Sequence, residues 1–573
     1  MNYSHEHLKN NLPAVSKNFF PEQRVLLFIM LVFLAQAVIA QAPPQEWLRT
    51  YDGGSGYFDQ IKFVRLDAQE NIVVTGVAVE GSTYWDVTTV KYTPAGDTLW
   101  THTWNNSTYN FDDQPNDMEI APNGDIIITG YSKLTDDSWD INSNMFVLAI
   151  DQDGDLAWSD SIKGSGYVDQ GYYTGRNIGF DIEITDAGDI YVAGQAMGNN
   201  VTEYDQMVVA KYNSSGVRQW LTFRDNSTAW GYADFGRGIG LDAQGNAYIC
   251  GATTLVNTWT DMATWKITSG GNFRYIAIEP GNDNNTGEAL NEIITDPQGN
   301  SYVFGISSDN VYKLIKYDSL LNEEWVYPFD TIATSISSSF TGADRHMAFD
   351  ADGNLILAGC MDGKIGVCKF TPSGTPLWIK LVSGTGPYNN EIYRVLTGAD
   401  NSIYLTGAVS MLGTSYWDIG TFKLDPSGDL SWFIPHAGPG NINDKSHSMA
   451  VASDGSVYIG GFGNGYSSSG DYLLIKYNPT LVGVSENKNS FTKQMSVFPN
   501  PAAGNCSVFF NSEVVLIGLE VFDMQGKLVY HENIQGAKSL NRNVDLSFLE
   551  SGCYQLKAIT EDNSYVSPVI IQK

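Results

Sequence analysis

Cysteine is scarce in this sequence, and its scarcity excludes two kinds of cross-linked architecture. The cysteines are Cys250, Cys360, Cys368, Cys506 and Cys553. An odd and sparse set does not make a disulfide framework. No CxxC pair or Cys/His cluster is present, so no zinc site is predicted. Cys360 and Cys368 flank one hairpin, and the sequence leaves open whether these two thiols pair.

Basic residues are also few. The chain carries 64 acidic and 33 basic residues, for a formal net charge of −31. Such a field repels duplex nucleic acid and anionic membrane surfaces, so neither is predicted as a partner. The negative charge by itself indicates only solubility.

Long apolar runs are missing after residue 39. Residues 25–39 (VLLFIMLVFLAQAVI) follow Arg24 and end at small residues. This pattern is typical of a signal peptide over residues 1–40, cleaved between Ala40 and Gln41. A permanent membrane anchor is the alternative, but the uninterrupted apolar core is shorter than the ~20 residues that span a bilayer. We therefore expect export through the inner membrane without a permanent transmembrane anchor.

The motifs of the common catalytic classes are absent as well. The chain has no GxSxG, HExxH, P-loop or strand-to-helix GxGxxG, so we predict neither an enzyme nor a cofactor. The turns DQDGD at 151–155 and DADGN at 350–354 resemble fragments of calcium loops. Neither has a distal bidentate Glu. Calcium at these turns therefore remains only an alternative to ordinary hairpin turns.

The sequence contains one repeat in eight copies. Each copy has an apolar stretch, a tight Asp/Asn/Gly turn, a second apolar run ending in Gly, a polar loop, a Lys-Tyr strand and then Trp. The eight anchor glycines are Gly76, Gly130, Gly194, Gly251, Gly305, Gly359, Gly407 and Gly460. A period of roughly 50 residues with several short strands per unit predicts the blades of an all-β propeller.

The aromatic residue that ends each copy predicts how the array closes. It follows the Lys position by nine residues in most copies, but the last copy has Ser485 there. Trp47, near the start of the predicted mature chain, has no blade before it. The simplest account is that the N-terminal strand completes the last blade, because closure protects sheet edges. This predicts eight four-stranded blades over residues 43–482, with a seven-bladed ring or an open array as the alternative.

The repeats resemble the bacterial SBBP beta-propeller repeat family. The resemblance is carried by the DxxGNxYxxG turn and strand, the Lys-Tyr strand and the terminal Trp. It implies a secreted scaffold without one shared chemistry. The family name refers to seven blades, whereas eight copies are counted here.

After the repeats, residues 483–495 predict a polar linker, and residues 496–573 predict a small Ig-like β-sandwich. This end resembles the type A sorting domain of the type IX secretion system of Bacteroidetes. The resemblance is carried by Phe498, Pro499, Asn500, Pro501 and Ala502, by the hairpin at 522–527, by residues 545–549, and by residues 551–554. It implies the type IX secretion machinery as a partner and a secreted or outer-surface location. A carbohydrate-binding or fibronectin-like sandwich is the alternative.

One set of equivalent positions is a candidate ligand site. Thirteen residues before the anchors lie Phe63, Asp117, Asp181, Gly238, Glu292, His346, Arg394 and His447. The polar members Asp117, Asp181, Glu292, His346, Arg394 and His447 are predicted to ring the centre, where convergent polar groups suit ligand binding. Hydrogen bonds that lock neighbouring blades are the structural alternative.

We therefore predict a secreted or cell-surface propeller scaffold that binds an extracellular protein or glycan. Exposed aromatics at Tyr84, Trp85, Tyr416 and Trp417 are candidates to take part. A polysaccharide-active enzyme is a second hypothesis, and it requires paired carboxylates, for which Asp117 and Asp181 are the pair to inspect. A purely structural surface component is the third.

Overall fold

The computed structural model divides the chain into two compact units, residues 1–481 and 482–573. It describes residues 42–571 except 55–56, 81–83, 136–141, 165–166, 170–171, 198–204, 225–233, 255–259, 280–288, 308–310, 330–344, 362, 383–389, 412–415, 441, 466–469, 480–494, 499–501, 503, 524–526 and 561–563. The predicted signal peptide, its cleavage site at Ala40 and Gln41, and Pro499, Asn500 and Pro501 lie outside the described residues. The described residues form strands and no helix, and so include no helix able to cross a membrane.

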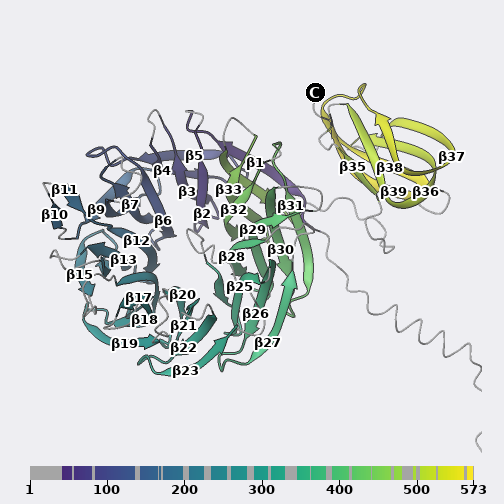
Figure 1. Cartoon of the computed structure of the whole chain (residues 1–573). Helices are drawn as coiled ribbons and strands as arrows, with labels where there is room; N and C mark the ends of the chain where they lie inside the picture. The colour runs from purple at the N-terminus through teal and green to yellow at the C-terminus, as the bar shows by residue number, and fades with distance from the viewer. Residues whose placement is uncertain are drawn as a thin grey trace, which may run out of the picture. The chain divides into compact units, whose positions relative to one another are not determined.

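Eight four-stranded antiparallel sheets build the first unit (Figure 1). The first three are β2–β5 (Gln60–Leu66, Ile72–Ala78, Asp86–Tyr92, Thr98–Trp104), β6–β9 (Asp113–Ile120, Ile126–Lys133, Ser143–Ile150, Leu156–Ile162) and β12–β15 (Ile178–Ile184, Ile190–Met197, Asp205–Tyr212, Arg218–Arg224). The next two are β16–β19 (Phe235–Leu241, Ala247–Thr254, Thr260–Ile267, Phe273–Glu279) and β20–β23 (Ala289–Thr295, Ser301–Ile306, Tyr312–Tyr317, Glu323–Pro328). The sixth and seventh are β24–β27 (Met347–Phe349, Leu355–Met361, Lys364–Phe370, Pro376–Val382) and β28–β31 (Glu391–Thr397, Ile403–Ser410, Trp417–Leu424, Leu430–His436).

The eighth sheet combines the two ends of the unit. It contains β32 (Lys445–Val451), β33 (Val457–Gly463) and β34 (Asp471–Tyr477), followed by β1 (Gln45–Tyr51). A separate short hairpin, β10 (Tyr167–Asp169) and β11 (Tyr172–Thr174), follows the second sheet.

Burial within each sheet follows the order of its strands. The second and third strands of the first sheet, β3 and β4, are buried throughout, whereas its fourth strand β5 is largely exposed. Continuous apolar runs such as Ile72–Ala78 therefore pack on both faces, between two neighbouring sheets. The first strand of each sheet contacts the preceding sheet, and β2 contacts β32 and β33 of the eighth sheet. The contacts thus return to their start, and Figure 1 shows the sheets arranged around a common centre.

A β-bulge near the start of the innermost strand explains the anchor glycines of seven sheets, whereas β24 of the sixth sheet pairs with β25 without a register shift. Ile61 lies opposite Gly76, but Phe63 lies opposite Thr75, so Lys62 is the extra residue. The bulge pushes a carbonyl toward the glycine, and a Cβ on Gly76 would lie 1.9 Å from the carbonyl oxygen of Gln60. Only glycine tolerates this approach.

The same register corrects the anchor of the eighth repeat. In this sheet Ser446 lies opposite Gly461 and Ser448 lies opposite Gly460, with His447 as the extra residue. The equivalent anchor is therefore Gly461, and not Gly460 as the sequence pattern suggested. Because Gly460 and Gly461 are adjacent, the sequence repeat can be aligned on either one, and only the strand pairing shows which glycine is equivalent to the other anchors.

Tryptophans on five of the fourth strands join their sheet to the next by a hydrogen bond. The indole Nε1 of Trp100 donates to the Gln152 carbonyl (2.9 Å), and that of Trp378 donates to the Pro426 carbonyl (3.3 Å). Trp47 on β1 pairs with Lys476 on β34 and donates in the same way to the Pro94 carbonyl of the first sheet (3.2 Å). The N-terminal strand therefore makes the contact that the last repeat lacks.

Removal of the Trp47 ring is expected to cost about 3–5 kcal/mol of unfolding free energy, because it empties a buried site at the join between the eighth and first sheets. Trp47→Ala should match Trp378→Ala, the equivalent change at an internal join. Tyr57→Ala, which removes a ring that is 50% exposed, should cost less than about 0.5 kcal/mol. Urea denaturation measures all three. A Trp47→Ala effect as small as that of Tyr57→Ala would contradict the role of β1.

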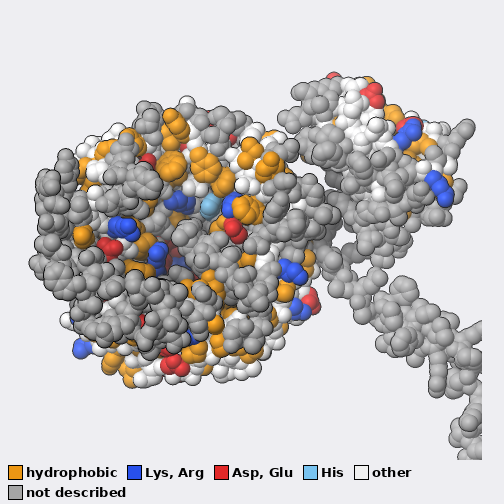
Figure 2. Space-filling view, viewed as in Figure 1, with side chains coloured by type: hydrophobic (Ala, Val, Ile, Leu, Met, Phe, Trp, Pro, Cys, Tyr) orange, Lys and Arg blue, Asp and Glu red, His pale blue; other side chains and the backbone are white. Residues whose placement is uncertain are grey.

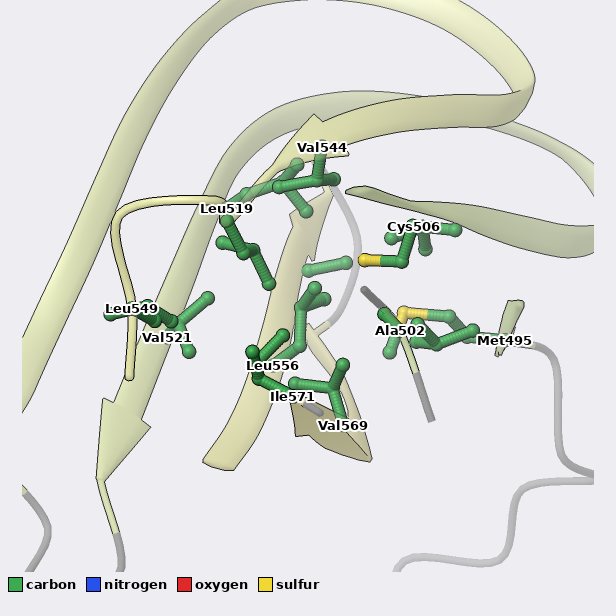
Figure 3. Packing of buried hydrophobic residues seen from close by; sticks show 14 of the residues in the cluster. Met495, Ala502, Cys506, Leu519, Val521, Val544, Leu549, Leu556, Val569 and Ile571 are labelled. Carbon is green, nitrogen blue, oxygen red and sulfur yellow. The ribbon is translucent and has the colours of Figure 1, made fainter. Parts of the chain in front are cut away.

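The second unit is one five-stranded antiparallel sheet, and not the two separate sheets of the sandwich that the sequence suggested. It contains β35 (Met495–Phe498), β36 (Asn505–Asp523), β37 (Leu528–Asp545), β38 (Gly552–Thr560) and β39 (Ser564–Ile571). The long β36 explains the difference, because its first part pairs with β35 and its last part pairs with β38. Apolar side chains from these strands, including Leu519, Leu556 and Val569, pack into one core (Figure 3).

Candidate functional site

The ring of polar residues predicted from the repeats serves first to tie neighbouring sheets together. The Asp117 carboxylate accepts a hydrogen bond from the Ile182 backbone N–H (2.8 Å), and Asp181 accepts one from Ile239 (2.7 Å). Each acceptor lies on one sheet and each donor on the next. These carboxylates therefore satisfy backbone groups that are buried between sheets.

The same link recurs further around the ring. Glu292 accepts from the Met347 N–H (2.8 Å), and Ser448 accepts from the Val64 N–H (2.9 Å), which joins the eighth sheet to the first. The His346 ring Nε2 lies 3.0 Å from the Ile392 carbonyl. Ser448, and not His447, occupies the ring position of the eighth sheet, so the predicted place of His447 was wrong by one residue.

An arginine just before the first strand of the sixth sheet joins this ring to acidic residues of the second and third sheets. The Arg345 guanidinium lies 2.9 Å from a Glu183 oxygen, 3.6 Å from Asp181 and 3.9 Å from Glu119. Arg65 of the first sheet also pairs with Glu119, at 2.9 Å. Far-apart parts of the sequence thus meet in one ion-pair network at the centre of the unit.

The carboxyl groups of this network differ in their electrostatics. Burial raises the pKa of Asp181 well above its usual value and also raises the pKa of Glu183, although Arg345 opposes both shifts. Burial acts on Glu119 too, but the charges of Arg65 and Arg345 outweigh it and lower the pKa of that carboxyl. The sequence pattern identified Asp117 and Asp181 but missed Glu119, Glu183 and Arg345, which lie at other offsets from the anchors.

A cavity of about 310 Å³ adjoins the network. Its polar lining comes from Glu183, Arg345, Arg394 and Thr295, and the rest is mainly apolar, with Ile294 and Phe349 among its members. This volume lies at the lower end of the range for small-ligand sites. The predicted residue Arg394 is therefore placed at a cavity, whereas Asp117 is not among the residues that line it.

The bulge residues of the innermost strands form a second set, with a different chemical character. Lys62 donates to Gln114 Oε1 (2.8 Å), and the Arg237 guanidinium lies over the Phe180 ring, 4.7 Å from its centroid. The His447 ring lies 5.4 Å from the ring of Tyr393. Figure 2 shows basic, histidine and acidic side chains gathered near the centre of the face in view.

Neither Lys62 nor Arg237 forms an ion pair with any carboxylate in the part of the chain that the structure describes. Burial lowers the pKa of Lys62 to about 8 and also lowers the pKa of Arg237. Burial, with the nearby charges of Lys62 and Lys445, lowers the pKa of His447 to about 3, so its imidazole is neutral at physiological pH. An anion close to Lys62 or to Arg237 would relieve the cost of burying that cation.

In the turns that resemble calcium loops, the aspartates form other interactions. Asp151 Oδ1 accepts from the N–H groups of Asp153 (3.0 Å) and Asp155 (2.9 Å). Asp350 forms an ion pair with Lys369 at 2.7 Å. Across the described residues, no group of three or more acidic, His or Cys side chains is placed to hold a metal ion.

The thiols of Cys360 and Cys368 are free and buried, so the pairing left open by the sequence is not present. Cys360 lies opposite Ile365 and Cys368 lies opposite Leu357 in their shared hairpin. The two cysteines are therefore not cross-strand partners.

Comparison with known proteins assigns the second unit. Residues 496–572 match the family model of the secretion system C-terminal sorting domain. The protein is exported, and it is secreted or reaches the outer surface of the cell. The sorting domain implies an interaction with the type IX secretion machinery. No curated protein matches the sequence.

Among solved structures, the similar chains include propeller-like proteins. A protein of unknown function from Bacteroides caccae has 10% identity and a TM-score of 0.29, covering 63% of this chain and 93% of that chain. Sqt1 from Chaetomium thermophilum has 10% identity and a TM-score of 0.44, covering 74% and 97%. The polysaccharide lyase Uly1 has 9% identity and a TM-score of 0.38, covering 74% and 90%.

Proposed function

We propose that the protein is an exported, closed eight-bladed propeller of the SBBP repeat type that binds an acidic glycan at the centre of its ring. The observation that carries the proposal is the set of bulge residues Lys62, Arg237, Phe180, Tyr393 and His447. These positions supply cations without carboxylate partners among the described residues, next to aromatic rings. Sugar carboxylates or sulfates would pair with the cations, and sugar faces would pack on the rings.

Buried cations at the bulge positions are notable because the protein as a whole is strongly acidic. The chain carries a net charge of −31, so the field of the whole protein disfavours the approach of anions. An acidic ligand would need local cations, and the buried Lys62 and Arg237 on the innermost strands β2 and β16 support such a role. The proposed site lies at the bulge positions next to the predicted ring, and of the six predicted polar residues it keeps only His447.

The hypothesis of a polysaccharide-active enzyme is less favoured by the geometry. Asp117 and Asp181 each accept a hydrogen bond from the backbone of the next sheet, which supports a structural role for both carboxylates. Glycoside hydrolysis requires two carboxylates that face a substrate across a gap. Release of reducing ends from the bound polymer would support this second hypothesis, and would overturn the assignment of a pure binding function.

Binding should be measured by calorimetry with a polyuronate and with a neutral glucan as its control. We expect the double variant Lys62→Gln/Arg237→Gln to bind the polyuronate at least tenfold more weakly, since two charge-assisted contacts are lost. Lys380 lies on the outer strand β27, is partly exposed and pairs with Asp429. The control variant Lys380→Gln should therefore bind the polyuronate as the unaltered protein does. Equal loss in both variants would reveal diffuse attraction, and no binding by the unaltered protein would refute the proposal.

A further inference from the structure

The joins between sheets repeat one geometry. The backbone N–H of a residue at or just before the start of an innermost strand donates to a carbonyl at or just before the start of the preceding sheet's third strand. Asp113 donates in this way to Trp85 (2.7 Å), and Asp444 donates to Trp417 (2.8 Å). The residue after each of these carbonyls is again an aspartate, Asp86 or Asp418. Two buried carboxyl groups from neighbouring sheets therefore meet at each of these joins.

Other joins carry asparagine at the position of Asp113 and show what the position requires. Asn177 Oδ1 accepts from the Gly164 N–H (2.8 Å), and its Nδ2 donates to the Ser143 carbonyl (2.7 Å). Asn390 likewise donates from Nδ2 to the Gly363 carbonyl (2.8 Å). The Ser143 and Gly363 carbonyls are equivalent to that of Trp85. The position thus needs one acceptor atom and one donor atom.

Asp113 supplies the acceptor but cannot supply the donor. Its Oδ2 accepts from the Asn106 N–H (2.8 Å), as Asn177 Oδ1 accepts from Gly164. Its Oδ1 therefore replaces the amide Nδ2, and an ionised oxygen cannot donate to the Trp85 carbonyl. Asp113 Oδ1 and Asp86 Oδ1 are both buried without a hydrogen-bond partner in the described part of the chain.

The two side chains are almost wholly inaccessible, with exposed fractions of 0% for Asp113 and 4% for Asp86. At the other aspartate joins the equivalent carboxylates are satisfied. Asp444 accepts from the Asn464 N–H (2.7 Å) and from the Gly438 N–H, and Asp59 accepts from Val79 (2.9 Å) and Gly53 (2.8 Å). The join between the first and second sheets is therefore the one where oxygen atoms of both facing carboxylates lack partners among the described residues.

The surroundings add negative charge. Burial raises the pKa of Asp113 to about 6 against the effect of the Ser132 hydroxyl, which lies opposite on β7 and carries no positive charge. Asp112 is already paired with Lys133 (2.7 Å), and Glu80 accepts from the Tyr51 hydroxyl. Burial, and then the charge of Asp113, raises the pKa of Asp86 to about 7. Ionised carboxylates at this join need a cation, because unpaired buried charge is costly.

We propose that the join between the first and second sheets binds a calcium ion through Asp86, Asp113 and the Trp85 carbonyl, with water completing the shell. Calcium takes oxygen ligands, including carboxylates, backbone carbonyls and waters. Two carboxylates make a weak site, in the range of about 10⁻⁴–10⁻³ M that is typical of extracellular modules. Millimolar calcium fills a site of this affinity.

Terbium luminescence and calcium-dependent melting of the full-length mature chain test this inference. Tb³⁺ replaces Ca²⁺ at oxygen sites, and the indole of Trp85, next to Asp86 in the chain, would sensitise its emission. We expect emission that 10 mM CaCl₂ displaces, and a melting temperature about 3 °C higher in 10 mM CaCl₂ than in EDTA. Asp86→Asn and Asp113→Asn should each lose both responses, whereas the matched control Asp418→Asn at the join of the seventh and eighth sheets should keep both.

The two asparagine variants are also expected to remain folded, because asparagine supplies the missing donor, as Asn177 does. A calcium response that persists in both variants would overturn the proposal. It would equally be overturned if the unaltered chain ignored calcium and Asp86→Asn raised its melting temperature at pH 8. That result would mean that the two carboxyl groups share a proton in place of a metal ion.

Discussion

Replacement of Gly251 by alanine is expected to lower the unfolding free energy by about 3 kcal/mol or more. A Cβ at this position would lie 1.9 Å from the Phe235 carbonyl oxygen. The contact is with backbone at the bulge of β16, so no side-chain rotation relieves it. The bulge or the pairing of β16 with β17 must shift, and the packing against both neighbouring sheets shifts with it. Gly251 matters because of this close approach, and its φ is not in the left-handed region.

Gly359 provides the matched control. It is the anchor of the sixth sheet, yet a Cβ there meets no atom within 4 Å, so Gly359→Ala should change stability by less than about 0.5 kcal/mol. Urea titration followed by tryptophan fluorescence measures both variants. All 14 tryptophans precede residue 482, so the signal reports on the first unit alone. Equal stability of the two variants would contradict the crowding at the bulge.

Deletion of residues 482–573 is expected to abolish export across the outer membrane while leaving the first unit folded. The sorting domain match lies entirely within the deleted part, at residues 496–572. The first unit has its own hydrophobic cores, none of which uses a residue beyond 481. Cell fractionation should therefore find the truncated chain inside the outer membrane, with unchanged tryptophan fluorescence.

A fusion of residues 482–573 to an unrelated exported reporter is the complementary control. It should reach the medium or the cell surface, because the domain forms a separate compact unit. Surface delivery of the truncated chain, or failure of the fusion, would show that the first unit carries part of the export signal.

The sequence predicted much of the fold because the same residues recur with the same spacing. The nine-residue interval from Lys to Trp corresponds to a direct cross-strand pair, such as Lys91 with Trp100. Trp47 was predicted as the missing aromatic of the last repeat for this reason, and it pairs with Lys476. Repetition thus supplies several independent observations of each contact.

The candidate site was harder to predict, because it depends on where copies differ. Arg345 meets Glu183 although 162 positions separate them in the numbering, and no spacing within one repeat indicates such a pair. His447 was misplaced because two adjacent glycines follow it at 460–461. The unpartnered oxygens of Asp86 and Asp113 become visible only when the joins are compared in three dimensions.

The pairing of β1 with β34 also has a consequence for the order of folding. Trp47 and Lys476 are neighbours in the sheet but lie at opposite ends of the first unit's sequence. A chain that emerges amino-terminus first must therefore carry β1 unpaired until the final repeat follows it. Contacts of such sequence separation form slowly, because a long loop must close before they stabilise anything. The eighth sheet can therefore form only after the last repeat of the first unit has emerged.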